Sequence, residues 1–330
     1  MLRDTLKTLL EAYGGSGSEH GVAEAIRTLL EGHVDSMKTD VMGNLIVEKY
    51  GTDDNAKRIM IAAHMDHIGL IVTHIEDDGF LRVTNVGGVS VDMSRGRHVV
   101  FANGVNGVCW VEPKENGAPT MANLFIDIGA ATAEEAAAMV SLGDVAVYAP
   151  NVFNVGKHRV AAPAMDDRCA CALLVELLQY TEGQKNTIIG VFTTQEEVGL
   201  RGATVAAYAV NPDIGLALDV TAWGDTPEDK IPAIKLGEGP AVKIMDRSMI
   251  ATPAIRDALL EAADLANVKV QREVLPFGGT DGGAIQRTRA GVPTGTLSIP
   301  CRYVHSACEM IDMRDMEGAL KLLLQFVDHV

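Results

Sequence analysis

Residues 187–202 read TIIGVFTTQEEVGLRG, an apolar run that ends in two adjacent glutamates, Glu196 and Glu197. The run predicts a buried strand, and GLRGATVAAYAV at residues 199–210 predicts a helix after it. Stability gives no reason for this pair, because neighbouring carboxylates repel each other and are costly to desolvate. A solvated pair that caps the next helix is one interpretation. A metal centre is the other, since one carboxylate can bind a cation while its neighbour transfers a proton.

Strands and helices alternate on both sides of this stretch, which predicts an α/β fold with an open, mainly parallel or mixed sheet flanked by helices. Before it, we expect helices at residues 2–13 and 19–32 and strands at residues 40–50 and 57–70. After residue 160, the expected helices are 164–180, 253–266, 282–290 and 313–330, and the expected strands are 214–220, 268–274 and 294–300.

The stretch between about residues 67 and 159 differs from its surroundings. Short alternating segments separated by Gly, Asn and Asp turns indicate a small β-rich domain with one clear helix, for which Thr132 is a candidate cap. Ser18 is a candidate cap for the helix at 19–32. Because α/β segments flank the β-rich stretch, we predict one α/β domain built from residues 1–66 and 160–330, with residues 67–159 inserted.

Composition restricts the class of function. The 330 residues exceed the usual size of one hydrophobic core, and 47% hydrophobic with 22% charged residues is typical of a globular protein. A net charge of −16 argues against nucleic-acid or anionic-membrane partners, because both need a basic surface. No apolar run suits a signal peptide or a membrane span. Five cysteines without a CxxC pair indicate reduced thiols, so we expect a cytoplasmic protein.

Polar residues follow the apolar strands at the ends where ligands gather in open α/β sheets. Each alone could be a satisfied polar residue, and Asp167 would suit the N-cap of the helix that follows it. Together they provide two histidines and several carboxylates, which are donors for two cations such as Zn²⁺, Co²⁺ or Mn²⁺. These residues are His64, Asp66, Asp166, Asp167, Glu196, Glu197, Asp219 and His305.

Six motifs, in this order, resemble those of the tetrahedral aminopeptidase family of co-catalytic metallopeptidases. That family also contains glutamyl and deblocking aminopeptidases and members once labelled endoglucanases. Each motif is modest alone, but six in register are very specific, and the resemblance covers nearly the whole chain. The motifs are AAHMDHIGL, AMDDR, TTQEEVGLRGA, ALDVT, GGTDGGAI and RYVHSACE. The resemblance implies a zinc-peptidase-like α/β fold and two divalent metal ions per subunit, with zinc or cobalt favoured over manganese.

The resemblance also implies the metal ligands. His64 and Asp219 would bind the first metal, and Glu197 and His305 the second. Asp166 would bridge the two. Three ligand carboxylates and a bridging hydroxide would offset two divalent cations, which makes the buried acidity tolerable.

The resemblance assigns the remaining roles too. Asp66 would orient the His64 imidazole, and Asp167 would follow Asp166 in a cis peptide. Glu196 would be the general base, which deprotonates the metal-bridging water and passes the proton to the leaving amine. The chemistry agrees, because amide hydrolysis must protonate the departing nitrogen and one glutamate must therefore stay off the metals.

The glycine-rich segment FGGTDGGAI at residues 277–285 could cradle a phosphate, but it lacks the P-loop lysine, and Asp281 would repel the anion. The resemblance places it beside the substrate pocket. The candidate pocket residues, for some of which structural hydrogen bonding is an equal explanation, are Gly279, Asp281, Arg302 and Tyr303. His67 stands where many family members have Glu, and we expect it to be a bystander.

The resulting prediction is a two-metal aminopeptidase that removes N-terminal residues from short peptides. By resemblance, its inserted domain mediates dimerisation and the dimers assemble into a tetrahedral dodecamer. Two alternatives stay open: a metal-dependent carboxypeptidase or deacylase of the same clan, and a catalytically silent, metal-stabilised assembly module. A glycosidase is excluded, because its two acids must lie about 5 Å or more apart across a sugar, and adjacent glutamates rarely do.

Overall fold

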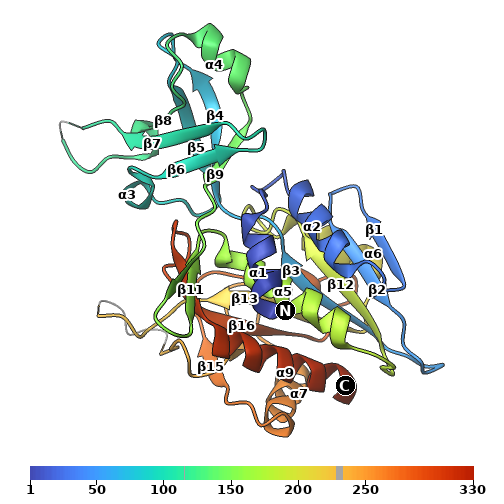
Figure 1. Ribbon diagram of the computed structural model, residues 1–330. Coiled ribbons are helices and arrows are strands. Elements are labelled where there is room, and N and C mark those ends of the chain that lie inside the picture. The colour runs from blue at the N-terminus through green and yellow to red at the C-terminus, as the bar shows by residue number, and fades with distance from the viewer. Residues whose placement is uncertain (115, 228–232) are drawn as a thin grey trace.

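The computed structural model describes residues 1–114, 116–227 and 233–330, and it contains a layered α/β body from which a smaller β-barrel projects (Figure 1). Both chain termini lie in the α/β body. Within the described residues, the α/β body is built on an eleven-stranded mixed sheet. The predicted fold class, an α/β sheet flanked by helices with a small β-rich domain inserted, is confirmed.

Four parallel strands form the centre of the sheet, in the order β12, β3, β13, β16. They are β3 (Arg58–His64), β12 (Thr187–Thr193), β13 (Ile214–Thr221) and β16 (Thr294–Arg302). Nearly all of their residues are buried, which explains why β3, β12 and β13 are mostly apolar runs in the sequence rather than alternating ones. In β16, the buried residues include the polar Thr294, Thr296 and Ser298. Their register places Thr193 beside His64, so the carboxyl ends of β12 and β3 are level with each other.

Antiparallel pairs extend this centre on both sides. β2 joins β12 and carries β1, and β17, β11 and β10 continue outward from β16. β14 pairs antiparallel with β16 and parallel with β15. These strands are β1 (Ser36–Thr39), β2 (Leu45–Lys49), β10 (Phe153–Val155), β11 (Arg159–Ala162), β14 (Ala241–Met245), β15 (Gln271–Val274) and β17 (Glu309–Asp312). β10 thus belongs to the larger sheet, although it lies within residues 67–159.

Helices cover both faces of this sheet. Alternate residues of β3 pack to opposite sides: Ile59 and Ile61 join the core with α1, α2, α5, α7 and α9, whereas Met60 joins the core with α6 and α8. The helices are α1 (Leu2–Glu11), α2 (His20–Leu30), α5 (Met165–Tyr180), α6 (Arg201–Val210), α7 (Pro253–Leu265), α8 (Asp281–Gln286) and α9 (Met313–His329).

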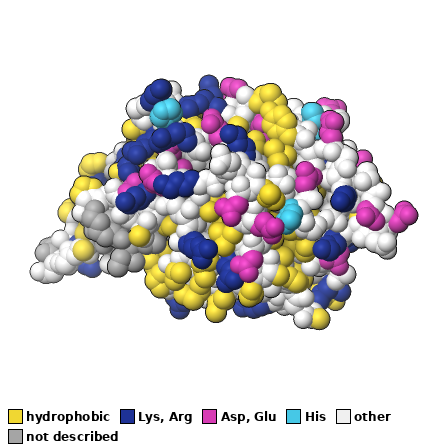
Figure 2. Space-filling view, turned by 90° about the horizontal axis from the view of Figure 1, so that it is seen from below, with side chains coloured by type: hydrophobic (Ala, Val, Ile, Leu, Met, Phe, Trp, Pro, Cys, Tyr) yellow, Lys and Arg dark blue, Asp and Glu magenta, His cyan; other side chains and the backbone are white. Residues whose placement is uncertain are grey.

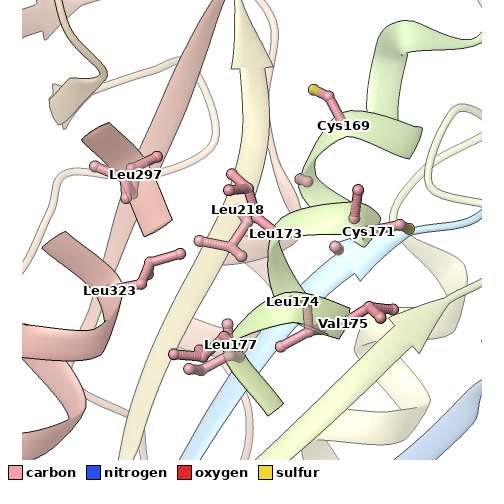
Figure 3. Close-up of a cluster of buried hydrophobic side chains, with 14 of the residues drawn as sticks. Cys169, Cys171, Leu173, Leu174, Val175, Leu177, Leu218, Leu297 and Leu323 are labelled. Carbon is pink, nitrogen blue, oxygen red and sulfur yellow. The ribbon is translucent and has the colours of Figure 1, made fainter. Parts of the chain in front are cut away.

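The central helix α5 is buried on all sides over most of its length. Figure 3 shows Leu173 of this helix beside Leu218 of β13, and the same buried cluster includes Leu297 of β16 and Leu323 of α9. Such a helix lies in the interior of the body, so its first turn, which contains Asp166, is held rigidly against the ends of the strands.

The barrel has its own hydrophobic core and closes in the order β4, β5, β8, β7, β6, β9. Its strands are β4 (Gly69–Ile75), β5 (Leu81–Val86), β6 (His98–Phe101), β7 (Asn106–Val111), β8 (Leu124–Asp127) and β9 (Val145–Tyr148), and its helices are α3 (Val91–Ser94), η1 (Met121–Asn123) and α4 (Ala133–Met139). The predicted cap of α4 is confirmed, because the Thr132 side chain accepts a hydrogen bond from the Glu135 N–H.

Two other predicted caps are wrong. The N-cap of α2 is Glu19 rather than Ser18, and it makes no side-chain cap hydrogen bond. Asp167 lies inside the irregular first turn of α5 rather than before it, and its Oδ2 accepts the N–H of His64 at 3.3 Å. The peptide bond between Asp166 and Asp167 is cis, as the resemblance implies.

The surface is mixed in charge. Figure 2 shows acidic, basic and hydrophobic side chains intermingled on the face away from the barrel. None of the helices in the described ranges is both long enough and apolar enough to cross a membrane.

Arg168, in the first turn of α5, joins the N-terminal segment to Met65, which directly follows β3. It is fully buried and donates hydrogen bonds to the carbonyl oxygens of Met65, Leu9, Ala12 and Gly14, at 2.7–3.3 Å. Burial lowers its pKa to about 10, so the guanidinium keeps its charge at neutral pH. A single buried side chain therefore satisfies four backbone carbonyls.

Replacing Arg168 with Met should lower the free energy of unfolding by about 3 kcal/mol, because buried carbonyl oxygens lose their donor. Chemical denaturation followed by circular dichroism measures this. Arg256→Met is the matched control, since Arg256 forms an exposed pair with Asp257, and its loss should leave the free energy of unfolding nearly unchanged. Equal losses in the two variants would contradict the proposed importance of Arg168.

Candidate functional site

A cavity of about 630 Å³ opens at the carboxyl ends of the four parallel strands. This is the position at which open α/β sheets bind their ligands. One part of its lining is acidic and contains the imidazoles, and the other part is mainly apolar. The acidic part consists of His64, Asp166, Glu196, Glu197, Asp219 and His305.

Each of these side chains is placed by the end of a strand or by the first turn of α5. His64 is the last residue of β3, and Asp219 lies near the end of β13. Glu196 and Glu197 lie just beyond β12, after Thr194 and Gln195, and His305 lies just beyond β16. The strand ends are level because of the parallel register, so residues from distant parts of the sequence meet in one cavity.

The first group of candidate metal ligands is His64, Asp166 and Asp219, all buried. The His64 Nε2 atom lies 3.1 Å from Asp166 Oδ1 and 3.9 Å from Asp219 Oδ1. One ligand atom from each residue lies within 4.8 Å of the other two, which is compact enough for a single cation to contact all three.

The second group is Asp166, Glu197 and His305, with the same 4.8 Å limit between ligand atoms. The His305 Nε2 atom lies 3.4 Å from Asp166 Oδ2 and 3.3 Å from Glu197 Oε2. Asp166 thus offers one oxygen to each group. The structure brings together the five residues that the resemblance names as ligands and divides them in the same two sets.

Asp66 ties the ends of β3 and β12 together. Its carboxylate accepts the N–H of Glu196 at 2.9 Å, the N–H of Glu197 at 3.3 Å and the hydroxyl of Ser16 at 2.6 Å. Its backbone oxygen lies 2.9 Å from His64 Nδ1, which leaves Nε2 facing the cavity. Asp66 therefore holds the two glutamates and the imidazole in one arrangement without facing the cavity itself.

Glu196 faces the same cavity but belongs to neither group. Its Oε2 atom lies 3.9 Å from His64 Nε2, and its side chain is only 12% exposed. A carboxylate in this place can reach a reacting group beside the two candidate metal positions and remain free to carry a proton.

The pKa values describe a cluster that attracts positive charge. Burial alone would lower the pKa of His64, but the Asp166 carboxylate, whose Oδ1 lies 3.1 Å from Nε2, raises it well above its usual range. Burial also opposes protonation of His305, yet its hydrogen bonds with Asp166 and Glu197 raise its pKa to about 11. Burial raises the pKa of Glu196 well above its usual range. Protons bound by these groups supply the positive charge that a divalent cation can supply instead.

The donor set fits divalent cations. Asp166 Oδ1 and Glu197 Oε1 are buried and accept no hydrogen bond from any described residue. Buried carboxylate oxygens are normally paired, so these two are available to a cation. Imidazole and carboxylate donors without thiolate suit Zn²⁺, Co²⁺ or Mn²⁺.

Two carboxylates that support the site were not assigned a role from the sequence. Glu309 is buried, and its two oxygens accept the N–H groups of Asp166 at 2.9 Å and His305 at 2.7 Å. Glu19 accepts the N–H of Gln195 at 3.0 Å, directly before the glutamate pair. Glu309 ends the RYVHSACE motif, but nothing in that motif indicates a carboxylate that binds backbone rather than metal.

The four candidate pocket residues are in different surroundings. Gly279 lines the cavity. Asp281 is buried and its Oδ2 accepts a hydrogen bond from the Thr193 hydroxyl. Arg302 forms a two-bond ion pair with Asp225, with N–O distances of 2.6 and 2.7 Å.

Tyr303, the fourth of these residues, packs edge-on against Trp223, with ring centroids 5.6 Å apart. His67 is buried, and burial with the nearby Arg168 charge lowers its pKa to about 3, so it is neutral at physiological pH.

A turn that follows β5 brings the barrel against the second ligand group. A Cβ atom on Gly88 would lie 2.3 Å from His305 Nδ1, and one on Gly87 would lie 3.1 Å from Glu197 Oε2. The Gly87 carbonyl accepts hydrogen bonds from the Asn85 side chain at 2.8 Å and the Val89 N–H at 3.1 Å, which hold the turn in place. Only glycine at position 88 leaves room for the imidazole where it stands.

Gly88→Ala should push the His305 imidazole away from Asp166 and Glu197. Affinity for the divalent ion held by the second ligand group should fall about 10- to 100-fold, as when a group that orients a ligand is lost. Calorimetric titration of metal-depleted protein with Co²⁺ measures this. Gly318→Ala on α9, where an added Cβ meets only side chains at 3.2–3.3 Å far from the cavity, is the control. Identical titrations for the two variants would mean that the turn does not position His305.

Comparison with known proteins gives a consistent result. The family model described as M42 glutamyl aminopeptidase matches residues 43–322. A putative aminopeptidase from Acetivibrio thermocellus is 44% identical over 98% of each chain. A lysyl aminopeptidase from Pyrococcus furiosus is 36% identical, over 97% of this chain and 94% of its own.

Solved structures agree with these relatives. An aminopeptidase from the archaeon Desulfurococcus kamchatkensis superposes with a TM-score of 0.95 and 37% identity, over all of this chain and 95% of its own. The TET1 peptidase of Pyrococcus horikoshii, which can assemble into a tetrahedron or a large octahedral shell, superposes with a TM-score of 0.90 and 32% identity over the whole of both chains.

Proposed function

The chain belongs to the M42 glutamyl aminopeptidase family, and from this premise we propose that the acidic cavity is the catalytic site of a two-metal aminopeptidase acting on short peptides. The observation that carries the proposal is the position of Asp166, which has one oxygen in each of two three-residue ligand groups. A single shared carboxylate between two such groups is the arrangement expected for a pair of cations acting together.

We propose that His64, Asp166 and Asp219 hold one cation and that Asp166, Glu197 and His305 hold the other, with zinc or cobalt as the ions and manganese as an alternative. Two such ions, when bound, polarise the scissile carbonyl and lower the pKa of water. Asp66 keeps the His64 ring oriented and, through the backbone of Glu196 and Glu197, keeps the other carboxylates in register.

Glu196 is the proposed general base. It faces the cavity, belongs to neither ligand group, and is held by the hydrogen bond from its own N–H to Asp66. Its carboxylate takes the proton of the attacking water and then delivers it to the nitrogen of the departing amine. The adjacent glutamates therefore have separate tasks: Glu197 binds a cation and Glu196 transfers the proton.

Glu196→Gln tests this division of roles. The variant should retain its metal, because Glu196 belongs to neither ligand group, and should lose about 10²–10⁴-fold in kcat on aminoacyl 4-nitroanilides. Metal analysis and kinetics on the same preparation measure both quantities. Glu197→Gln, the matched control, should lose metal as well as activity. Full turnover in Glu196→Gln would refute the mechanism, and loss of its metal would mean that the two roles are exchanged.

N-acetylated peptides belong in the same assay. An aminopeptidase needs the free amine, so acetylation should abolish cleavage. Cleavage of the acetylated peptides at a similar rate would instead favour the carboxypeptidase or deacylase alternative, and no cleavage of any substrate by the metal-loaded protein would favour the silent assembly module.

Metal removal should lower stability. Chelation leaves the clustered carboxylates without a cation, so Tm should fall by at least about 5 °C, and Zn²⁺ or Co²⁺ should restore it. Calorimetry with and without chelator measures the shift. The variant Asp166→Asn loses the carboxylate shared by both groups and should show a much smaller metal-dependent shift. If the metal-dependent Tm shift of Asp166→Asn equals that of the unchanged protein, the stabilising ions bind at another site.

We propose further that the chain is organised as residues 1–66 and 160–330 around an inserted dimerisation domain at 67–159, and that dimers build a tetrahedral dodecamer. The closed barrel with its own core and the likeness to a peptidase that forms a tetrahedron support this. The cysteines Cys109, Cys169, Cys171, Cys301 and Cys308 are all free, which supports a cytoplasmic location.

A further inference from the structure

The part of the cavity beyond the ligand groups is apolar. It is formed by the end of β13 and by the segments that follow β12, β13, β15 and β16. Its apolar side chains are Leu200, Val220, Ala222, Trp223, Leu275, Phe277 and Val304. Trp223 is fixed by a hydrogen bond from its Nε1 to the Thr226 hydroxyl and by the ring of Tyr303. A substrate side chain that enters this part therefore meets hydrocarbon and a fixed indole.

Lys243 of β14 is the only lysine or arginine among the described residues that line the cavity. Its side chain is 1% exposed, and its ammonium lies 2.9 Å from Glu273 Oε1 and 3.6 Å from Asp246 Oδ2. Lys243 and Glu273 are opposite each other in the paired strands β14 and β15, so the backbone register itself sets their contact.

The two carboxylates that pair with Lys243 are themselves held in place. Glu273 Oε1 also accepts the Thr221 hydroxyl at 2.7 Å, and Asp246 Oδ1 accepts the N–H groups of Ser248 and Met249 at 2.7 and 2.8 Å. One buried cation thus faces two buried carboxylates. The ammonium is neutralised before a substrate arrives, and the cluster carries no surplus positive charge.

We infer that this cavity selects peptides whose N-terminal residue has a neutral, apolar side chain, and that the paired Lys243 excludes acidic ones. The inference rests on the proposed function. An acidic side chain would have to compete with Glu273 and Asp246 for the ammonium. A basic side chain would be repelled by the Lys243 ammonium, because Lys243 lines the cavity whereas Glu273 and Asp246 do not. An apolar side chain loses no polar partner and is covered by Leu200, Leu275 and their neighbours.

The inferred preference for apolar N-terminal residues differs from the substrates that the names of related proteins give for those proteins. The family description refers to glutamyl substrates, and the relative from Pyrococcus furiosus is a lysyl aminopeptidase. The expected preference is argued from the paired Lys243 and the apolar lining observed in this cavity.

The test is a panel of 4-nitroanilides of Leu, Met, Phe, Ala, Lys and Glu with metal-loaded protein. We expect kcat/KM for Leu, Met and Phe to exceed that for Glu and Lys at least about tenfold. The Glu side chain must compete with Glu273 and Asp246 for Lys243, and the Lys side chain is repelled by Lys243. A Glu or Lys substrate that equals or exceeds the apolar ones overturns the inference.

Glu273→Gln tests the role of the pair. It removes one of the two negative charges while keeping an acceptor oxygen, so the ammonium becomes available to a substrate carboxylate. The ratio of kcat/KM for Glu to that for Leu should rise at least about fivefold. Glu238→Gln is the matched control, because it removes a carboxylate from an exposed pair with Lys269 outside the cavity, and it should leave the ratio unchanged. An unchanged ratio in folded Glu273→Gln also overturns the role of Lys243.

Asp246→Asn serves as a second variant if Glu273→Gln does not fold, with the same expected direction. Failure of the inference is distinguishable from failure of the proposed function. If cleavage depends on Glu196 but Glu or Lys substrates are preferred, only the inferred selectivity is overturned. If cleavage does not depend on Glu196, or if no substrate is cleaved, the proposed function is overturned.

Discussion

The structure depends on one electrostatic constraint, the concentration of buried carboxylates at the carboxyl ends of four parallel strands. Asp166, Glu196, Glu197 and Asp219 share a single cavity with two imidazoles. Removing such charges from water costs several kcal/mol each unless positive charge compensates them. The rigid sheet and the buried helix α5 hold them together despite their repulsion. Cations bound between the carboxylates would offset this free-energy cost.

The acidic residues divide into those that face the cavity and those that hold the backbone. Asp66, Glu309 and Glu19 accept N–H groups of residues in or beside the ligand groups. Hydrogen bonds to a carboxylate are among the stronger ones, and these three fix the strand-end loops from which the other side chains project. The positions of the ligand atoms are therefore set by carboxylates that do not themselves belong to either group.

Other parts of the molecule complete the cavity. The turn at Gly87 and Gly88 brings the barrel into contact with Glu197 and His305, so the barrel contributes to the second ligand group as well as having its own core. On the far side, β14 and β15 place a neutralised lysine against an apolar wall. In the proposed function, binding of the cations and choice of the substrate side chain would thus fall to different segments around one cavity.

The sequence by itself determined the elements whose signals are local. Mostly apolar runs marked β3, β12 and β13, and the polar residues after β3 and β12 marked His64, Glu196 and Glu197, because strand burial and strand ends can be read along the chain. The six ordered motifs then led to the family, and to Asp166 as the shared residue, by resemblance rather than by spacing.

Only the tertiary structure decided which separate segments meet. The contact of Gly88 with His305, the pairing of Lys243 with Glu273 across two strands, and the hydrogen bonds of Glu309 to two backbone N–H groups all join residues that no local pattern connects. β14 and β17 are short strands that pair with β16, a partner set by the fold rather than by a pattern within either segment. Local periodicity reports burial along a chain, but the partners of a side chain are set by where the whole chain folds.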